Sequence, residues 1–254
     1  MRVHVLASGS GGNCLLLEDR EDKYLIDAGL SKRRVDAALA SLGCRMEQIG
    51  GVLITHEHSD HISGLESLCR RSGLPVYAPR TVAARLLGSR PWLQDQLRVI
   101  PTGEPFALGG LRITAFHTSH DTDESVGYRV EGEGTYAHAT DTGCVTEEMR
   151  RALTGADTVL LESNHDEEML RYGPYPFPLK KRILSAAGHL SNADCAAFAR
   201  ELALHGTRQI ILAHLSRENN TPAKAMAETG RALQDLPTAL FCAPVLGCLT
   251  VEVR

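Results

Sequence analysis

The sequence predicts an α/β protein built as a four-layer αββα sandwich, in which two mixed sheets pack together and helices cover their outer faces. Three features of the 254 residues favour this class. Short apolar strand patterns alternate with helical patterns throughout, strand patterns fill both halves of the chain, and some follow one another closely enough to form hairpins. Together these features favour two sheets over one doubly wound sheet.

The candidate strands are short apolar or alternating runs, namely Val3–Ala7, Cys14–Leu17, Tyr24–Asp27, Gly51–Thr55, Val76–Ala78, Arg112–Phe116, Val126–Val130, Thr135–Thr140, Thr158–Glu162, Gln209–Ala213, Ala239–Cys242 and Leu249–Val253. The candidate helices have apolar residues at helical spacing, namely Lys32–Leu42, Ile62–Arg71, Thr81–Leu87, Glu147–Leu153, Asp166–Arg171, Leu179–Ala186, Asn192–Leu204 and Pro222–Leu236. Thr221 followed by Pro222 is a typical helix start, because proline is accepted at the first helical position. The three prolines in Tyr172–Pro178 predict a loop without regular structure.

The composition is that of an ordinary soluble globular protein, with 43% hydrophobic and 23% charged residues. No linker or low-complexity tract divides the chain, so we expect residues 1–254 to form a single domain. No apolar run approaches the roughly 18 residues that span a bilayer, so we expect neither a transmembrane helix nor a membrane partner.

The cysteines and the charge indicate where the protein works and what it binds. Seven cysteines without a C-x-x-C motif, behind an N-terminus that lacks a signal-peptide pattern, predict reduced thiols and a cytoplasmic location. The net charge of −4 gives no general attraction to nucleic acid, so binding of nucleic acid would require a local basic patch.

The stretch Ile54–Gly64 reads ITHEHSDHISG and concentrates groups that bind metal ions. In an extended segment residues two apart share a side, so His56 and His58 can hold one ion. The chain then turns into a helical pattern, which directs Asp60 and His61 towards a second ion. A polar loop with incidental histidines is the alternative, but three imidazoles and one carboxylate within six residues favour metal binding.

The motif HEHSDH resembles the signature of the metallo-β-lactamase fold hydrolases, which use strand-end residues in five places. Asp27 after KYLI matches the first place, HEHSDH the second, Asp141 in ATDTG the fourth and His214 after QIILA the fifth. For the third place FHTSHD offers His117 and His120. His120 is favoured because it lies beyond the strand and precedes an acid that could orient it, whereas His117 reads as an ordinary strand residue. Asp141 could alternatively be a turn-forming aspartate.

This resemblance implies two ions that share one carboxylate and leave room for a water or hydroxide between them. One ion would take His56, His58, His120 and Asp141, and the other would take Asp60, His61, His214 and Asp141. Nitrogen and oxygen ligands without thiolate suit Zn²⁺ or Mn²⁺, and paired ions lower the pKa of a bridging water. Asp60 would belong to the catalytic group as well as to the ligands. Asp27 would hold a ligand or the loop without touching the metal.

The second half of the chain resembles the phosphodiesterase branch of this fold, which includes the tRNA 3′-processing endonucleases. The order of its motifs carries the likeness: Glu162 at a strand end, then Gly-His in GHLSN, then AHLS after a strand. The resemblance implies that Glu162 pairs with His189, which acts as the general acid, and that His214 binds metal.

A closer resemblance covers nearly the whole chain and is carried by LASGSGGN, LIDAGLS, ITHEHSDHISGL, TDTG, ESNHD, KKRILSAAGHLSN and AHLSRENN. These motifs look like those of the WalJ/YycJ family. That family implies a cytoplasmic bacterial metal-dependent nuclease, a 5′-to-3′ exonuclease acting on double-stranded DNA ends. No obligate protein partner is evident from the sequence. A bridging hydroxide would attack phosphorus while His189, assisted by Glu162, protonates the leaving group.

Other functions remain open at this point. A hydrolase of small or cyclic phosphodiesters could use the same site. A tRNA 3′-processing endonuclease is disfavoured because the chain has no obvious flexible arm for gripping tRNA. A thioesterase would leave Glu162 and His189 without a role, and a metal-binding regulator without turnover would not need the full ligand set.

The candidate substrate contacts lie in polar loops or basic runs near these motifs: Asn13, His165, Lys181, Ser191, Asn192 and Asn220. Each has a structural alternative. Asn13 ends the turn GSGGN, Lys181 belongs to a charge run typical of solvated helix faces, and Ser191 with Asn192 could cap a helix whose N-terminus faces phosphate.

Asn220 could simply end its loop, and His165 could bind phosphate, join a further metal or hydrogen-bond to backbone. The remaining histidines, His4, His138 and His205, are expected to be structural or surface residues.

Overall fold

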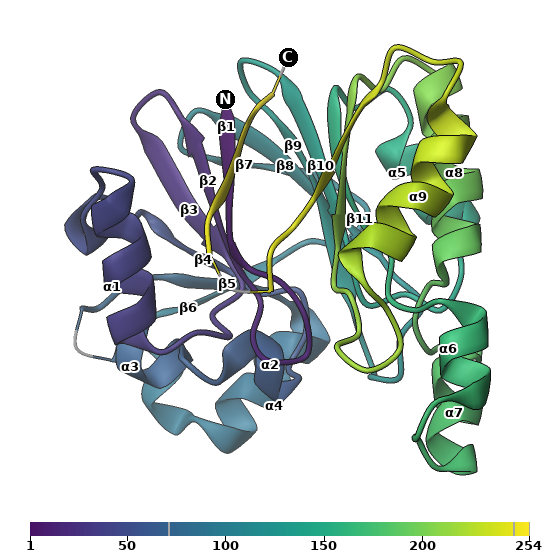
Figure 1. Cartoon of the computed structure of the whole chain (residues 1–254). Coiled ribbons are helices and arrows are strands. Elements are labelled where there is room, and N and C mark those ends of the chain that lie inside the picture. Colours follow the sequence, from purple (N-terminus) through teal and green to yellow (C-terminus); the bar gives the residue numbers. More distant parts are fainter. Residues whose placement is uncertain (71, 246, 254) are drawn as a thin grey trace.

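The computed structural model describes residues 1–70, 72–245 and 247–253, and it has the four layers that the sequence predicts. Figure 1 shows helices α1, α3 and α4 on one outer face, two sheets in the middle and helices α5 to α9 on the other outer face. Within the described residues each sheet has seven strands. The prediction of a four-layer αββα sandwich is therefore confirmed.

The first sheet is mixed. Its order is β14 (Leu249–Glu252), β1 (Arg2–Ala7), β2 (Cys14–Asp19), β3 (Asp22–Ile26), β4 (Gly51–Leu53), β5 (Val76–Pro79) and β6 (Leu97–Ile100). The pairs from β14 to β3 are antiparallel, and the pairs from β3 to β6 are parallel. The helices on this side are α1 (Lys32–Ser41), η1 (Met46–Gln48), α2 (Ser59–Ile62), α3 (Leu65–Cys69), α4 (Arg80–Ser89) and η2 (Pro91–Leu93).

The second sheet repeats this arrangement. Its order is β13 (Ala239–Cys242), β12 (Gln209–Ala213), β11 (Thr158–Glu162), β10 (Thr135–Ala139), β9 (Val126–Glu131), β8 (Leu111–His117) and β7 (Pro105–Leu108). Pairs from β7 to β10 are antiparallel, and pairs from β10 to β13 are parallel. The helices on this side are α5 (Glu147–Leu153), α6 (Glu167–Tyr172), α7 (Phe177–Ile183), α8 (Asn192–Leu204) and α9 (Pro222–Leu233).

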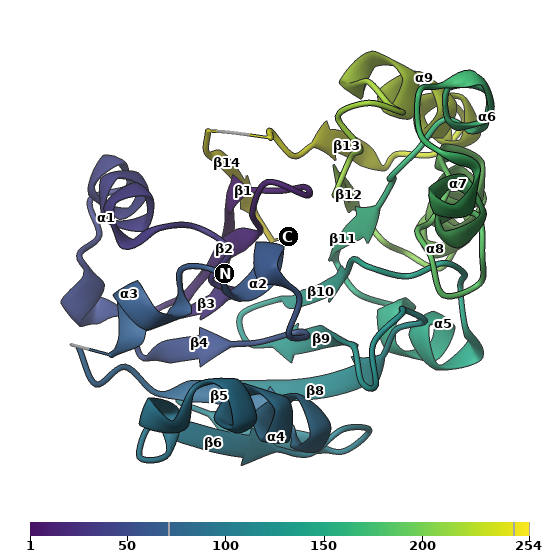
Figure 2. The same ribbon diagram turned by 90° about the horizontal axis from the view of Figure 1, so that it is seen from below.

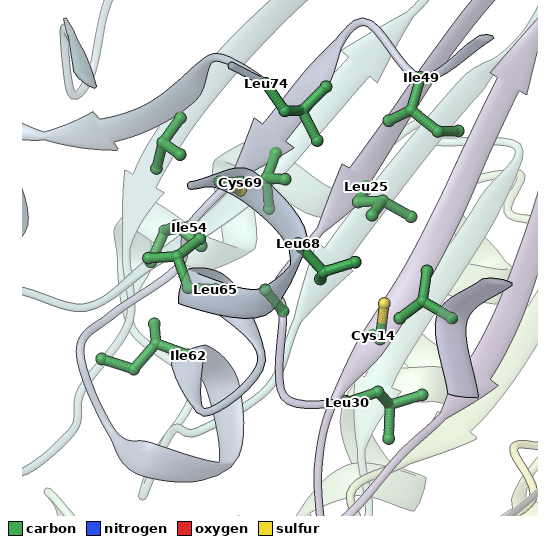
Figure 3. Packing of buried hydrophobic residues seen from close by; sticks show 14 of the residues in the cluster. Cys14, Leu25, Leu30, Ile49, Ile54, Ile62, Leu65, Leu68, Cys69 and Leu74 are labelled. Atoms are coloured by element: carbon green, nitrogen blue, oxygen red, sulfur yellow. The ribbon is translucent and has the colours of Figure 1, made fainter. Parts of the chain in front are cut away.

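Three clusters of buried apolar side chains fill the spaces between the four layers. One lies between the sheets, where Tyr128 and Tyr136 are fully buried. A second lies beneath α8 and includes Phe198. The third lies under α1 and α3, where Figure 3 shows Leu65 and Leu68 facing the first sheet. Each helix layer therefore has its own core, and the sheets are held together by the middle one.

Several element boundaries differ from the sequence prediction. Strands β6 and β7 were not predicted. The single helix expected over Ile62–Arg71 is wrong: it is two short helices, α2 and α3, separated at Ser63 and Gly64, and residue 71 lies outside the described residues. The loop expected over Tyr172–Pro178 ends earlier, because α7 begins at Phe177 and accepts Pro178 in its first turn.

The parallel strands of both sheets end at one edge, seen from below in Figure 2, where α2 lies near the ends of β4 and β11. Loops at the carboxyl ends of parallel strands are where α/β proteins build their sites. In the described part of the chain no helix is both long enough and apolar enough to span a membrane.

Candidate active site

The predicted site residues follow the carboxyl ends of strands from both sheets. Asp27 follows β3, and His56 comes shortly after β4; on the facing sheet Asp141 follows β10 and His214 follows β12. Three of these, Asp27 (φ 62°), Asp141 (φ 55°) and His214 (φ 55°), adopt the left-handed backbone region, which is uncommon for residues other than glycine. Such strain is tolerated where the surrounding structure fixes it, and here it turns the side chain out of the strand direction and into the site.

The structure brings all seven predicted ligands into one cluster. In four groups of side chains among the described residues, the donor atoms lie within 4.8 Å of one another. Two of these groups match the predicted ion sites, namely His56 with His58 and His120, and Asp60 with His61 and His214, while a third joins His56 and His61, from different predicted sites, to Asp141. Asp141 lies between the two predicted sites. Its Oδ2 is 3.2 Å from His61 Nε2, and its Oδ1 is 3.7 Å from His120 Nε2 and 3.6 Å from His214 Nε2.

The donor spacing fits small divalent cations. Two ligand atoms about 2.0–2.2 Å from one zinc ion at a tetrahedral angle lie roughly 3.3–3.6 Å apart. Here His58 Nδ1 is 3.3 Å from His120 Nε2, and Asp60 Oδ2 is 3.5 Å from both His61 Nε2 and His214 Nε2. The buried Nε2 atoms of His56 and His214 have no hydrogen-bond partner among the described residues. Buried polar atoms are normally paired, so these two are suited to a cation.

The charges of the cluster also favour a cation. Although burial opposes its ionised form, the pKa of Asp141 lies well below its usual value because of the His214 and His61 imidazoles. Against the same effect of burial, Asp141 raises the pKa of His61 well above its usual value and that of His214 to about 10. The buried carboxylates therefore hold positive charge in the cluster, and divalent cations can supply it in place of protons.

Asp27 touches one ligand and is held by the strand-end backbone. Its Oδ2 accepts a hydrogen bond from His61 Nδ1 at 2.7 Å, while its Oδ1 accepts one from the Thr55 amide at 2.9 Å. The Thr55 hydroxyl also lies 3.0 Å from His56 Nδ1. With Nδ1 of His61 engaged, its Nε2 faces the cluster, so Asp27 lies in the supporting position that the sequence predicts.

His120 joins the cluster and His117 does not. The exposed His117 contacts Glu148, with Nδ1 3.2 Å from Oε1. His120 Nδ1 lies 3.1 Å from the carbonyl oxygen of Gly188, and this contact directs Nε2 into the cluster. The following acid, Asp121, was expected to orient His120, but it lies 3.3 Å from Nε2 on the cluster side. The expected orienting role is therefore taken by the backbone of Gly188.

Glu162 serves two histidines. It is fully buried at the end of β11, and its Oε1 accepts from His189 Nδ1 at 2.7 Å and from His214 Nδ1 at 2.9 Å. Its Oε2 accepts from the Thr142 amide at 2.8 Å. The sequence predicted the pairing with His189, and the structure adds the pairing with His214.

His189 differs from His214 in its exposure. The His189 side chain is 20% exposed, whereas that of His214 is 4% exposed. Burial lowers the pKa of His189, but Glu162 outweighs this and raises it above the usual value. His189 also belongs to the remaining group of clustered donor atoms, with Asp141, Glu162 and His214. Its atom nearest to Asp141 is Nδ1, which is already hydrogen-bonded to Glu162 and therefore not free to bind metal. His189 is thus arranged as a protonated group beside the cluster.

The predicted substrate contacts divide into buried and exposed residues. Asn13 donates from Nδ2 to Asp60 Oδ2 at 3.2 Å and thereby holds a cluster residue. Asn192 and Asn220 donate to each other, with Asn192 Nδ2 2.9 Å from Asn220 Oδ1, and join the start of α8 to the loop before α9. Ser191 caps α8, as expected, by accepting from the Asp194 amide. Lys181 is exposed on α7.

His165 lies beneath this network and is 1% exposed. Neither of its ring nitrogens has a hydrogen-bond partner among the described residues, and burial lowers its pKa to about 4. The backbone carbonyl of His165 accepts a hydrogen bond of 2.8 Å from the amide of Asn192, the first residue of α8. The histidines expected to be structural behave in that way: His4 contacts Glu18, His138 contacts Tyr136, and His205 contacts a carbonyl of its own helix.

Thr55 is a residue of the site that escaped the sequence prediction. Thr55 touches Asp27 and two histidines, and its place directly before the H-x-H motif is the signal that could have revealed it. The guanidinium of the exposed Arg217 lies over Gly11, so that a Cβ at residue 11 would require this flexible side chain to move. Nothing in the pattern AHLSRENN predicts that contact.

Comparison with known proteins agrees with this geometry. Residues 22–215 match the model of the beta-lactamase superfamily domain. The chain is 39% identical to exodeoxyribonuclease YycJ of Bacillus anthracis over 92% of this chain and 90% of that protein. It is 40% identical to exodeoxyribonuclease WalJ of Streptococcus pneumoniae over 86% of this chain and 83% of that protein.

Among solved structures, the metallo-beta-lactamase fold protein YhfI from Bacillus subtilis superimposes with a TM-score of 0.73. The two chains are 17% identical, and the superposition covers 98% of each. At that identity the likeness concerns the fold alone.

Proposed function

The chain belongs to the beta-lactamase superfamily and, within it, to the YycJ/WalJ exodeoxyribonucleases, and from this we propose that it hydrolyses DNA from strand ends at the histidine–aspartate cluster. It is a metal-dependent hydrolase. The observation that carries the phosphodiesterase chemistry is Glu162 Oε1, shared between His189 Nδ1 and His214 Nδ1. This carboxylate couples a proton donor to the cluster, which phosphodiester cleavage needs for its leaving oxygen.

The site is proposed to hold two divalent cations, Zn²⁺ or Mn²⁺. One would bind His56, His58 and His120, the other would bind Asp60, His61 and His214, and Asp141 would contact both. Ligands of nitrogen and oxygen without thiolate support these metals. When bound, such a pair would activate a water molecule and neutralise charge on the attacked phosphate.

The protein's own groups then divide the proton transfers. As the water oxygen forms its bond to phosphorus, the bond from phosphorus to the leaving oxygen breaks. His189 holds its Nδ1–H on Glu162, so the proton it can give to the leaving oxygen is the one on Nε2. Its raised pKa keeps that proton in place near neutral pH, and the proton released by the attacking water restores the balance.

The finer properties follow from the family resemblance and are part of the proposal. We expect 5′-to-3′ digestion of double-stranded DNA by a single domain formed by residues 1–254. Asp60 would help to hold a cation at the reacting centre, and Asp27 holds His61. All seven cysteines are free, and free thiols support work in the reducing cytoplasm.

The test is digestion of duplex DNA labelled at either the 5′ or the 3′ end, with Mn²⁺ or Zn²⁺. A chromogenic phosphodiester and a tRNA precursor are assayed in parallel. We expect label release from one DNA end, and mononucleotides from the 5′ label support the proposed polarity. Turnover of the small ester or of the tRNA precursor without any digestion of DNA would refute the nuclease assignment.

The division of labour between the two histidines has its own test. His189→Ala should retain metal, measured by elemental analysis, and lose about 10²–10⁴-fold in turnover. His214→Ala should lose metal from one of the two sites. Equal loss of metal in both variants would contradict the proposed roles.

A further inference from the structure

Helices α6 and α7 carry an unusual concentration of exposed apolar side chains. In the described part of the chain, five large apolar residues stand out as exposed, and three of them lie here: Tyr172 (80%), Phe177 (77%) and Leu184 (58%). Tyr172 ends α6 and Phe177 begins α7, so the two aromatic rings flank one short proline-rich turn. Figure 1 shows α7 projecting beyond the rest of its helical layer. Exposed aromatic residues that cluster in this way mark binding surfaces.

The same segment is strongly basic in a chain whose net charge is −4. Residues 171–185 include four basic side chains and no acidic one: Arg171, Lys180, Lys181 and Arg182. Arg182 pairs with Asp121, and Lys180 donates to the carbonyl of Arg171 at 2.8 Å. Lys181 is exposed and has no ion-pair partner within the described residues. The segment is thus a local basic patch of the kind that a nucleic-acid ligand would require.

The C-terminal end of α7 is fixed to the rim of the active site. The His189 amide donates to the carbonyl of Ile183 at 3.0 Å, and the Ser119 hydroxyl donates to the carbonyl of Ala186 at 2.8 Å. Arg182 reaches Asp121, which lies 3.3 Å from His120 Nε2. The basic and aromatic surface therefore starts at the cluster and leads away from it.

We propose that residues 171–184, here called the α6–α7 arm, bind the DNA strand that continues past the scissile phosphate. Lys180 and Lys181 contact backbone phosphates, and Tyr172 and Phe177 stack on unpaired bases. This inference rests on the proposed nuclease function. The seven residues of α7 extend about 10 Å, which is long enough to lie along more than one nucleotide of the strand.

The positive charge of the arm favours a polyanion over the other possible partner, a second copy of this chain. A symmetric dimer through this face would bring Arg171, Lys180 and Lys181 against their own copies, and such like-charge contacts are unfavourable. Aromatic rings interleaved with cations are instead the combination that binds single-stranded nucleic acid.

The test compares two variants of the arm with two matched controls. The arm variants are Tyr172→Ala/Phe177→Ala and Lys181→Ala. The controls are Leu204→Ala, an exposed apolar residue at the end of α8, and Arg33→Ala, an exposed basic residue on α1 in the opposite helix layer. Each is assayed on duplex DNA with a single-stranded overhang and on the chromogenic phosphodiester, and each is checked for unchanged folding by circular dichroism.

We expect kcat/KM for DNA to fall relative to that for the small ester in both arm variants, through KM, and to stay constant in both controls. The double aromatic variant should lose about five-fold or more for each base that loses its stacking partner. Lys181→Ala should reduce the salt dependence of DNA binding by about one ion.

The outcomes separate the two proposals. If the wild type digests DNA and both arm variants have the same KM for DNA as the wild type, the arm proposal is wrong and the nuclease assignment stands. If the arm variants instead abolish a dimer seen by light scattering and leave the KM for DNA constant, the second copy is the occupant. Failure of the wild type to digest any DNA overturns the nuclease function itself.

Discussion

Replacing Asp27 by asparagine should cost metal affinity while leaving the backbone intact. Asp27 is 1% exposed and takes a left-handed φ of 62°, a conformation that asparagine also adopts readily. The carboxylate accepts two kinds of hydrogen bond at once, from His61 Nδ1 at 2.7 Å and from the Thr55 amide at 2.9 Å. An asparagine has only one oxygen, so its NH₂ group must face one of these two donors.

The Thr55 amide cannot change its role, so the imidazole must. If the NH₂ of asparagine faces His61 Nδ1, the neutral ring moves its proton to Nε2, the atom that lies 3.2 Å from Asp141 Oδ2 in the cluster. That proton blocks metal binding at Nε2. Loss of such a supporting partner typically weakens metal affinity 10–100-fold, which corresponds to about 1.4–2.8 kcal/mol.

The measurement is a chelator competition for Zn²⁺ or Mn²⁺, run on the wild type and on Asp27→Asn. We expect one of the two binding steps to weaken by about ten-fold or more, because His61 is the predicted ligand that Asp27 contacts directly. Asp22→Asn is the control, since Asp22 lies at the start of β3 and contacts the Gly110 amide, away from the cluster. Unchanged affinity for both ions in Asp27→Asn would refute the role that we derive for this carboxylate.

Three further predictions concern pH, metal removal and packing. Because Glu162 raises the pKa of His189, activity that needs the imidazolium should fall when the pH exceeds that raised pKa. Glu162→Gln removes this effect and should move the alkaline limb of the kcat–pH profile to lower pH. An unmoved limb would exclude His189 as the acid. Adding metal at about 100 times its Kd stabilises the fold by about 2.7 kcal/mol, so chelation should lower Tm by roughly 5–11 °C in calorimetry, and a constant Tm after complete metal loss would contradict the coupling. In Gly29→Ala the new Cβ would overlap the Asp60 carbonyl and lie 2.5 Å from the Asn13 amide, so urea unfolding should show a free energy of unfolding lower by about 1–3 kcal/mol or more. In the control Gly88→Ala, which has open space on helix α4, the free energy of unfolding should rise by about 0.5–1 kcal/mol. Similar values for the two variants would show that the close approach at Gly29 is not rigid.

The elements best predicted from sequence are those whose burial leaves a clear pattern. Strands β11 and β12 match their predicted bounds, because parallel central strands read as continuous apolar runs. Strands β6 and β7 escaped prediction because each lies at a sheet edge and has only four residues, which is too short for its pattern to stand out from a loop. The break between α2 and α3 arises from tertiary contact, since Gly64 packs against the backbone of residues 28 and 30.

The candidate site was predictable as a set of residues but not as a set of contacts. Each ligand follows a strand, and parallel strands end at one edge, so the topology alone gathers His56, Asp141 and His214. Contacts such as those of Thr55 with Asp27, or of Gly188 with His120, join segments far apart in the chain. No local pattern encodes them, because they depend on how the two sheets pack.

The two histidines of GHLSN and AHLS show how much a shared carboxylate adds to this arrangement. His214 leaves β12 through a left-handed residue that turns Nε2 into the cluster, whereas His189 follows α7 and remains partly exposed. Both rings place Nδ1 on Glu162 Oε1, at 2.7 and 2.9 Å, so one negative charge serves two imidazoles. A metal ligand must be neutral, and once His214 is neutral the full charge of Glu162 is available to hold a proton on His189. Metal binding at one histidine and proton retention at the other are therefore mutually supportive, which a sequence reading of two separate motifs does not reveal.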